Sequence, residues 1–236
     1  MSARLRAWVF GVGAAGAALL YALAVAGVPP FGGDRHPYRD LAVAAALRQS
    51  TANVVTSLTF DLRGFDTLGE EVILLGSVVG AVALLRVDEP GGGPATPKPL
   101  DAVAFLSYVF LPVTLLLGLD LLVHGHLTPG GGFQGGVVLA TGLHLLYLSG
   151  GMDALRRLRP VDWYEWAEGL ATTAFAALAI AAMVFGTGVL ANFLPHGRVQ
   201  QLISAGTVPV LNVIVGVVVG AGCVVLLAQF LTQAEQ

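Results

Sequence analysis

The sequence has few charged residues. Its 236 residues include 12 Lys and Arg and 15 Asp and Glu, or 11% of the chain, whereas 56% of the residues are hydrophobic. Soluble domains average about 25% charged residues. No Lys, Arg, Asp or Glu occurs in residues 7–33, 72–85, 102–119, 121–152, 169–197 and 199–234. These runs exclude water as the main solvent, because about 20 apolar residues let a helix cross a bilayer.

The sequence also lacks the residues from which most metal and cofactor sites are built. Its single cysteine, Cys223, lies in an apolar run, which excludes an internal disulfide framework and a thiolate metal cluster. His124 and His126 are close together, but a zinc site needs three or four ligands, and no further histidine or cysteine is near them in the sequence. No nucleophile–base pair is evident. We therefore expect no metal, no cofactor and no enzymatic activity.

The hydrophobic runs are continuous, as in LLYALAVAGV and VIVGVVVGAGCVVLL. Alternation with period 2 would be typical of a membrane β-barrel, whereas continuous runs favour helices, which satisfy their own backbone hydrogen bonds in lipid. The sequence thus predicts an all-α, multi-pass protein of the cell membrane with about six transmembrane helices. The expected spans are residues 8–28, 68–86, 102–123, 133–150, 166–190 and 207–231.

The distribution of Lys and Arg predicts the orientation. With the N-terminus inside, the inner segments hold seven of the twelve basic residues and the outer segments hold five. The RRLR cluster after the fourth span strengthens this bias, because cytoplasmic loops are enriched in Lys and Arg. Both termini are therefore expected in the cytoplasm. A cleaved signal peptide is the alternative for the first span, although signal cores are usually only about 7–15 residues long.

A stretch rich in glycine and proline divides the chain. Three glycines and four prolines in RVDEPGGGPATPKPLD cannot continue a helix. We expect a two-span segment over residues 1–86, a linker over 87–101 and a four-span domain over 102–236. Within the first segment, residues 34–67 contain apolar stretches too short to span. They predict one or two short helices at the membrane surface or against partners, with a re-entrant hairpin as the alternative.

The second span places carboxylates at the membrane border. Only 14 uncharged residues separate Glu71 from Arg86, so the helix must draw the FDTLGEE segment toward the hydrocarbon. Asp66 and Glu70 are four residues apart and share a helix face. An ionisable group at this depth marks an ion or proton path by default, so Asp66 and Glu70 are candidate path residues. In the alternative, Glu71 points to the headgroups and Glu70 pairs with Arg63.

The segment HGHLTPGGGFQGG has three possible interpretations. Its glycines formally match the dinucleotide-binding pattern, but that pattern requires a preceding buried strand in a soluble domain, so we expect no nucleotide. Two histidines are too few for a metal. The third interpretation, a tight outward-facing turn with a contact surface for neighbouring helices or subunits, fits the glycines and the proline. Its residues are His126, Pro129, Gly130, Gly131, Gly132, Phe133, Gly135 and Gly136.

Two further polar residues lie within predicted spans. His144 is near the middle of the fourth span, and an imidazole there can gain and lose a proton near neutrality. The alternative is a neutral ring that forms a hydrogen bond between helices. Asp120 lies one turn before His124, so it is either a candidate ion-path residue or the partner of His124 at the end of the third span.

The motifs GHLTPGGGFQGG and LLYLSGG resemble the MnhB family, which comprises the B-type subunits of Mrp-type multisubunit sodium/proton antiporters and their counterparts in membrane-bound hydrogenase complexes. The closing GTVPVLNVIVGVVVGAG is similar to that family's last span. The stretch TANVVTSLTFDLRGFDTLGEEVILL resembles the C-terminal end of the large A-type subunit, which some complexes carry as a separate small protein (MbhE-like). Asp61-Leu62 departs mildly from this pattern, in which an aromatic residue usually follows the acid.

The resemblance implies a fused, non-catalytic subunit of a sodium/proton antiporter complex in the cell membrane. It implies partners among the large antiporter-like and small membrane subunits, and no nucleic acid. The acid of the TLGE motif corresponds to Glu70. Two rival hypotheses remain: a membrane-arm subunit of a hydrogenase- or dehydrogenase-linked ion pump, and a scaffold without ion contact.

Overall fold

The computed structural model describes residues 3–28, 32–33, 36–85, 101–158, 160–185 and 188–234. All regular structure in these ranges is helical, which confirms the predicted fold class. The chain forms two compact units, Met1–Asp40 and Leu41–Gln236, which we call unit 1 and unit 2 and describe separately.

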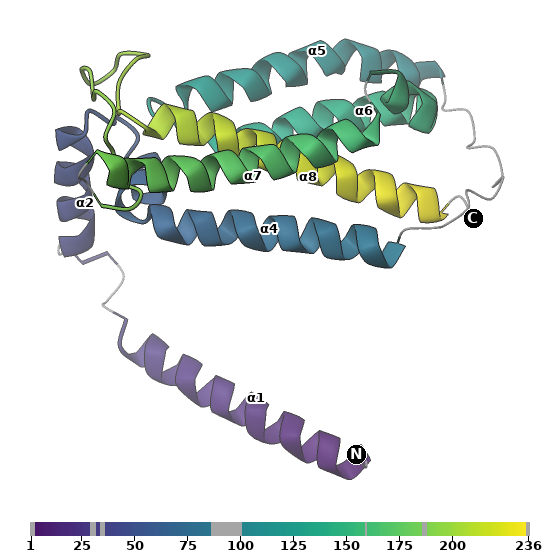
Figure 1. Ribbon diagram of the computed structural model, residues 1–236. Helices are drawn as coiled ribbons and strands as arrows, with labels where there is room; N and C mark the ends of the chain where they lie inside the picture. The colour runs from purple at the N-terminus through teal and green to yellow at the C-terminus, as the bar shows by residue number, and fades with distance from the viewer. Residues whose placement is uncertain are drawn as a thin grey trace. The chain divides into compact units, whose positions relative to one another are not determined.

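Unit 1 contains one long helix, α1 (Ala3–Ala26) (Figure 1). Its sequence is apolar on every side, and all side chains of residues 4–28 are exposed, including Trp8 at 74%. A helix that is hydrophobic all round is stable only in a hydrophobic environment. Lipid or other membrane helices provide that environment.

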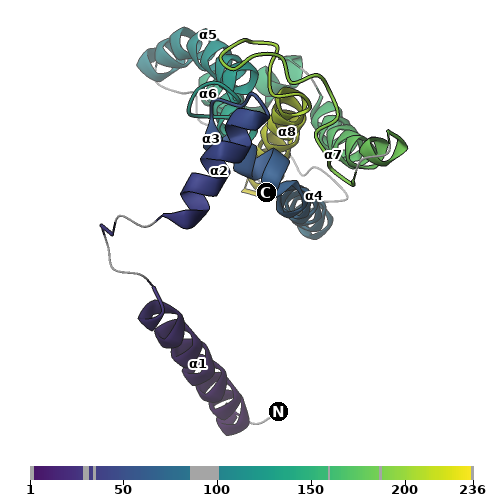
Figure 2. The ribbon, with the colours of Figure 1, turned by 90° about the vertical axis from the view of Figure 1, so that its left-hand side faces the viewer.

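Unit 2 is a bundle of five long helices. They are α4 (Gly64–Leu85), α5 (Asp101–His124), α6 (Gly132–Leu158), α7 (Val161–Val184) and α8 (Val208–Ala234). In Figure 1, α4, α6 and α8 run in one direction and α5 and α7 in the other. Figure 2, which looks nearly along the axes, shows α8 between α4, α6 and α7, with α5 on the outer side of α6. The helix α8 is therefore the centre of the bundle.

Five helices in the described residues are long and apolar enough to cross a membrane: Arg4–Ala26, Gly64–Leu85, Asp101–His124, Val161–Val184 and Val208–Leu231. The remaining predicted span, 133–150, forms the first part of α6. This helix is less apolar, and it is interrupted at Gly150 and Gly151, where Gly151 has a φ of 67°. The cytoplasmic location of both termini stays a prediction.

The short helices predicted in residues 34–67 are α2 (Pro37–Arg48) and α3 (Val54–Ser57), the latter followed by a π-helical turn, η1 (Leu58–Leu62). The side chain of Asn53 caps α3 by accepting hydrogen bonds from the backbone N–H groups of Val55 and Thr56. Residues 41–85 belong to the same compact unit as residues 101–234. Apart from Asp101, which begins α5, the predicted linker 87–101 lies outside the described residues.

Glycines bring the backbones of α6 and α8 into contact. A Cβ atom placed on Gly132 would lie 2.6 Å from the carbonyl oxygen of Asn212, and one on Gly136 would lie 2.7 Å from that of Gly216. Gly220 faces Gly136 from the next turn of α8. Small residues four apart on two facing helices permit this close approach in membrane proteins. The distance between α6 and α8 therefore depends on the absence of side chains.

We predict that Gly136→Ala destabilises the protein by about 1–3 kcal/mol, because the added methyl group clashes with backbone that cannot move freely. Gly80→Ala in α4 is the matched control, since nothing lies within 4 Å of its Cβ position. The measurement is thermal unfolding of the purified complex. Equal melting temperatures for the two variants would contradict the close contact of α6 and α8.

Candidate functional site

The glycine-rich segment is the connection between α5 and α6. The helix α5 ends at His124 and α6 begins at Gly132. Gly130 and Gly131 have φ values of 137° and 138°, which side-chain-bearing residues rarely adopt. A Cβ on Gly131 would also lie 2.9 Å from the Oδ1 atom of Asn212. The backbone conformation of the turn and its contact with α8 therefore explain why glycine occupies these two positions.

Side chains that precede α3 or belong to it hold this connection in place. The Nδ2 group of Asn53 donates hydrogen bonds to the carbonyl oxygens of Gly125 and Thr128, each at 2.8 Å. The hydroxyl of Thr56 donates to the same Gly125 oxygen at 2.7 Å. The backbone N–H of Asn53 donates to the carbonyl oxygen of His126 at 3.0 Å. The turn is therefore fastened to the segment 53–56 of its own chain.

Asn212 of α8 caps the first turn of α6. Its Oδ1 atom accepts a hydrogen bond from the backbone N–H of Gly132 at 2.9 Å, and its side chain is fully buried. The first N–H groups of a helix have no partner within the helix, so a side chain from a distant helix takes the place of a local cap. This hydrogen bond links the start of α6 to α8, the central helix of the bundle.

His126 has the largest buried side chain of the turn, with no exposed surface. Its ring faces the backbone of Gln201 and Leu202, and burial lowers the pKa of the imidazole below its ordinary value. The neighbouring His124 acts in the same direction, since a second positive charge nearby opposes protonation. His126 is therefore a neutral packing residue near pH 7.

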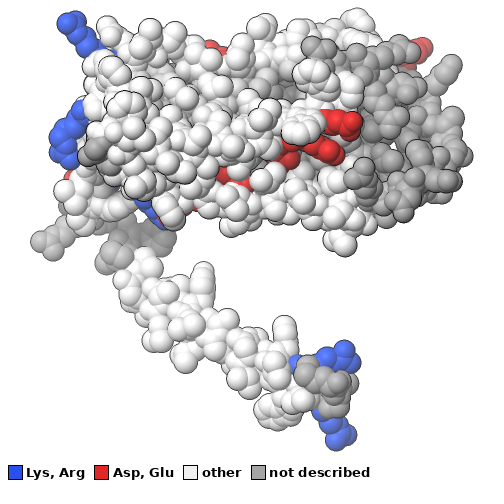
Figure 3. Space-filling view, in the orientation of Figure 1, with Lys and Arg blue, Asp and Glu red and all other residues white. Residues whose placement is uncertain are grey.

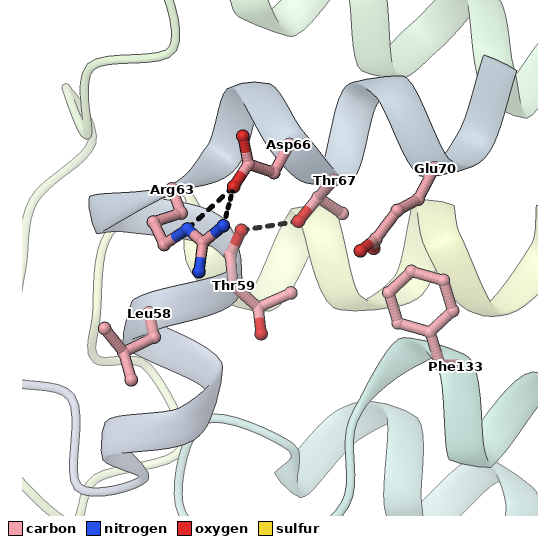
Figure 4. Close-up of a pocket in the computed structure, with 7 residues that line it drawn as sticks. All are labelled: Leu58, Thr59, Arg63, Asp66, Thr67, Glu70 and Phe133. Carbon is pink, nitrogen blue, oxygen red and sulfur yellow. Dashed lines mark hydrogen bonds and ion pairs between the residues drawn. The ribbon is translucent and has the colours of Figure 1, made fainter. Parts of the chain in front are cut away.

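A cavity of about 280 Å³ lies where η1 meets the start of α4 (Figure 4). Arg63 forms an ion pair with Asp66 on its rim, and the hydroxyl of Thr67 donates a hydrogen bond to the carbonyl oxygen of Thr59 at 2.6 Å. The lining residues are Leu58, Thr59, Arg63, Asp66, Thr67, Glu70 and Phe133. The cavity is thus polar on its α4 side.

Glu70 is exposed, and its carboxylate points toward Phe133 at the start of α6 (Figure 4). The Arg63 guanidinium forms an ion pair with Asp66, which lines the same cavity. The structure therefore brings together two of the four candidate path residues, Asp66 and Glu70. They lie on one side of α4, as their spacing predicted.

The other two candidates lie elsewhere. The Oδ1 atom of Asp120 lies 2.8 Å from the Nδ1 atom of His124 at the end of α5, and both side chains are substantially exposed. His144 is half-buried on α6, where its ring meets the backbone of Cys223 on α8 and its Nε2 atom has no hydrogen-bond partner in the described part of the chain. Neither residue lines the cavity that contains Glu70.

Sequence reasoning missed two buried carboxylates, Glu71 and Glu168. Their exposed fractions are 0% and 1%. The alternative in which Glu71 points to the headgroups is wrong, because the side chain of Glu71 is fully buried within the bundle. Glu168 lies near the start of the predicted span 166–190, but α7 begins at Val161, and Glu168, two turns into this helix, is buried. The available signal was the spacing of three in Asp162, Glu165 and Glu168, which indicates one helix face.

Comparison with known proteins identifies the family. Residues 102–225, more than half of the chain, match the model of a domain related to the MnhB subunit of Na+/H+ antiporters. The chain belongs to the MnhB family. The matched residues begin in α5 and include α6, α7 and most of α8.

Individual relatives extend the similarity beyond this domain. An uncharacterized protein of Methanocaldococcus jannaschii is 29% identical over 216 residues, which cover 78% of this chain and 78% of that protein. A probable K+/H+ antiporter A/B subunit of Rhizobium meliloti is 29% identical over 209 residues, or 75% of this chain and 20% of that protein. The Na+/H+ antiporter B subunit of Bacillus subtilis is 32% identical over 84 residues, or 36% of this chain and 55% of that protein.

Two solved structures share the fold. A chain of the membrane-bound sulfane sulfur reductase, an archaeal respiratory membrane complex, has a TM-score of 0.78 and 26% identity, with 96% of this chain and 98% of that chain covered. A chain of the Mrp complex from Dietzia sp. DQ12-45-1b has a TM-score of 0.68 and 23% identity, with 97% of this chain and 26% of that chain covered. The latter likeness shows the fold alone.

We predict that the protein loses stability as the pH falls below about 6.5, the usual histidine pKa in an unfolded chain, because the folded state resists protonation of His126. The stability that the neutral ring provides is fully present above that pH and is lost as the pH falls toward the lowered pKa of the folded state. The measurement is thermal unfolding of the purified complex at pH 7.5 and pH 5.5.

The variant His126→Gln removes the titrating group, so its melting temperature should change less between these two pH values than that of the wild type. His36→Gln is the control, because this histidine is exposed. An identical acid sensitivity of the His126→Gln variant and the wild type would contradict the assignment.

Proposed function

We propose that the chain is a non-catalytic membrane subunit of a multisubunit monovalent cation/proton antiporter complex, with Na+ as the cation. The match to the MnhB-related domain over residues 102–225 carries this proposal. The names of the relatives in Bacillus subtilis and Rhizobium meliloti, which are antiporter subunits, support it. The chain contributes to the assembly of the complex and to its cation path.

Exposed apolar surface supports an assembly with partner subunits. The helices α4 and α5 of unit 2 are largely exposed in their most apolar windows. The partners that suit such surfaces are the apolar helices of other membrane subunits, which pack by shape and by small residues. A complex of several membrane subunits meets this requirement.

The proposal extends to the organisation of the chain. Residues 1–86 take the role of the C-terminal end of the large A-type subunit, and residues 102–236 take that of the B-type subunit, joined by the linker 87–101. The similarity to the Rhizobium meliloti protein, whose name combines A and B, supports this fusion, because it covers 75% of the present chain. The fusion fixes a one-to-one ratio of the two parts.

We also propose that Glu70 and Asp66 form the entry of the cation path, because both line the cavity beside η1. The Arg63–Asp66 ion pair partly neutralises the rim, so Glu70 provides the free negative charge. Asp120 and His144 would belong to other parts of the path, since the structure places them away from this cavity.

A second candidate function is that of a membrane-arm subunit in a redox-linked ion pump. The likeness to the sulfane sulfur reductase chain favours it, because that likeness covers 98% of the other chain with a TM-score of 0.78. Gentle purification of the tagged chain separates the two candidates. Antiporter-like subunits alone support the antiporter, whereas iron–sulfur subunits in the same complex support the redox pump.

We expect that deletion of the chain abolishes sodium-dependent proton movement in membrane vesicles and prevents assembly of the complex. Expression of the complete chain from a plasmid should restore both. Vesicles that contain the chain alone should show no sodium-dependent proton movement, because the proposed role is accessory. Exchange by the isolated chain would overturn this proposal.

We expect that Glu70→Gln slows sodium/proton exchange without loss of assembly, because the substitution removes the charge and keeps the shape of the side chain. Glu70→Asp should retain part of the activity. Asp40→Asn is the control, since Asp40 is an exposed residue paired with Arg39. If the variants Glu70→Gln, Asp120→Asn and His144→Ala all exchange sodium at the wild-type rate, the chain is a scaffold without ion contact.

A further inference from the structure

The carboxyl group of Glu168 lies inside unit 2 at a point where three helices meet. The exposed fraction of this residue is 1%. A Cβ atom placed on Gly222 of α8 would lie 2.9 Å from the Oε1 atom of Glu168 and 3.2 Å from the Cγ2 atom of Val78 on α4. The helices α4, α7 and α8 also contact one another in pairs. The carboxyl group of Glu168 is therefore seated against α8 at a position where a side chain larger than that of glycine would collide with it.

The surroundings of this carboxyl group do not compensate a negative charge. The Oε1 atom of Glu168 is buried without a hydrogen-bond partner in the described part of the chain. The hydroxyl of Thr172, one turn further along α7, donates its hydrogen bond to the backbone carbonyl oxygen of Glu168 at 2.9 Å. The sequences of α4, α7 and α8 include no Lys or Arg. An ionised carboxylate would therefore lack both solvation and a counter-charge from the helices that enclose it.

The titratable groups on the neighbouring helices do not pair with Glu168. Glu71 of α4 is also fully buried, but it precedes Val78 by seven residues, or about 10 Å along the helix axis. The thiol of Cys223 follows Gly222 on α8, and the ring of His144 on α6 meets the backbone of Cys223. Among the described residues, the ion pairs involve other acidic groups. Glu168 is therefore an isolated buried carboxyl group.

We propose that Glu168 is a proton-binding site within the membrane and that Gly222 provides the space for its carboxyl group. The carboxyl group is protonated and neutral in the resting protein. A role of this site in proton movement rests on the function proposed above, because a proton/cation antiporter uses groups that gain and lose a proton within the membrane.

A proton fits this site better than a metal ion or a cationic side chain. Among the described residues, no set of three His, Cys, Asp or Glu side chains could hold a metal ion. A metal ion usually takes several oxygen ligands, whereas the Oε1 atom of Glu168 faces carbon atoms of Gly222 and Val78. A lysine or arginine of a partner subunit would need an opening to reach the carboxyl group, and Glu168 is almost completely enclosed. A proton needs only the carboxyl oxygen itself.

Two exposed acidic residues connect Glu168 to the surface of the bundle. Asp162 and Glu165 precede Glu168 on α7 at intervals of three residues, and both are exposed. Residues three apart on a helix are neighbours on one face. Figure 3 shows acidic side chains at the surface of the bundle over the first turns of α7. Glu165 therefore offers a route by which protons pass between water and Glu168.

The test is infrared spectroscopy of the purified complex in H2O and in D2O near neutral pH. A protonated carboxyl group gives a C=O stretching band that moves to lower frequency in D2O. We expect Glu168→Gln to lose one such band that the wild type shows. Glu71→Gln and Glu165→Gln should both retain this band, because they change a carboxyl group elsewhere on α4 and an exposed one on α7. Spectra of the wild type and of Glu168→Gln that do not differ in this region overturn the proposal.

A second variant covers the case in which Glu168→Gln does not assemble. Gly222→Ala keeps every titratable group and adds a methyl group against the Oε1 atom of Glu168, so the frequency of the band should shift. Gly80→Ala in α4 is the matched control, because nothing lies within 4 Å of its Cβ position. An identical band in Gly222→Ala and the wild type contradicts the proposed site. Absence of any such band from the wild-type complex overturns the proposal without a variant.

The outcome is distinguishable from failure of the proposed function. If deletion of the chain abolishes sodium/proton exchange but no infrared band depends on Glu168, the antiporter assignment holds and the proton-binding site fails. If the complex exchanges no cation while the band follows Glu168 and Gly222, the site holds and the antiporter assignment fails.

Discussion

The structure of unit 2 depends on the contact between the backbones of α6 and α8. A Cβ atom on Gly132 or Gly136 would lie less than 3.0 Å from backbone atoms of α8, and one on Gly220 would lie 3.3 Å from the carbonyl oxygen of Gly136. This proximity allows Asn212 to reach the first N–H group of α6 and the turn before α6 to press against α8. Because α8 also contacts α4 and α7, its position determines where their carboxylates lie. Lipid tails are as apolar as the helix surfaces, so the hydrophobic effect does not drive helices together in a membrane. Helix packing there depends on shape complementarity and on hydrogen bonds between helices.

The distribution of polar groups follows from this arrangement. Asp66 and Glu70 face a cavity at one end of α4, whereas Glu71, one residue further, points into the interior. A helix turns by about 100° per residue, so neighbouring residues in the sequence can face an open cavity and a closed interior. Buried charges are retained in membrane proteins where they serve transport or partner contacts. The two environments on α4 therefore agree with a transport role for the family to which this chain belongs.

The sequence was sufficient to predict the helices, since apolar runs without charge can hardly form anything else in a membrane. It also placed Asp66 and Glu70 on one helix face. The sequence did not predict the features that depend on contacts between residues far apart in the chain. The burial of Glu168 depends on the start of α7 at Val161 and on the space beside Gly222, which no local pattern reveals. Likewise, local residues predict a turn at the glycine segment, but its attachment to Asn53 joins positions more than 70 residues apart.

The π-helical turn η1 has a consequence for the tolerance of the chain to insertions and deletions. It lies between Asn53, which is fixed to the glycine turn, and Gly64, where α4 begins. A single-residue deletion there would rotate α4 by about 100° about its axis and would exchange the environments of its acidic side chains. The number of residues in this segment therefore determines which side of α4 faces the bundle, and it matters more than their chemical identity.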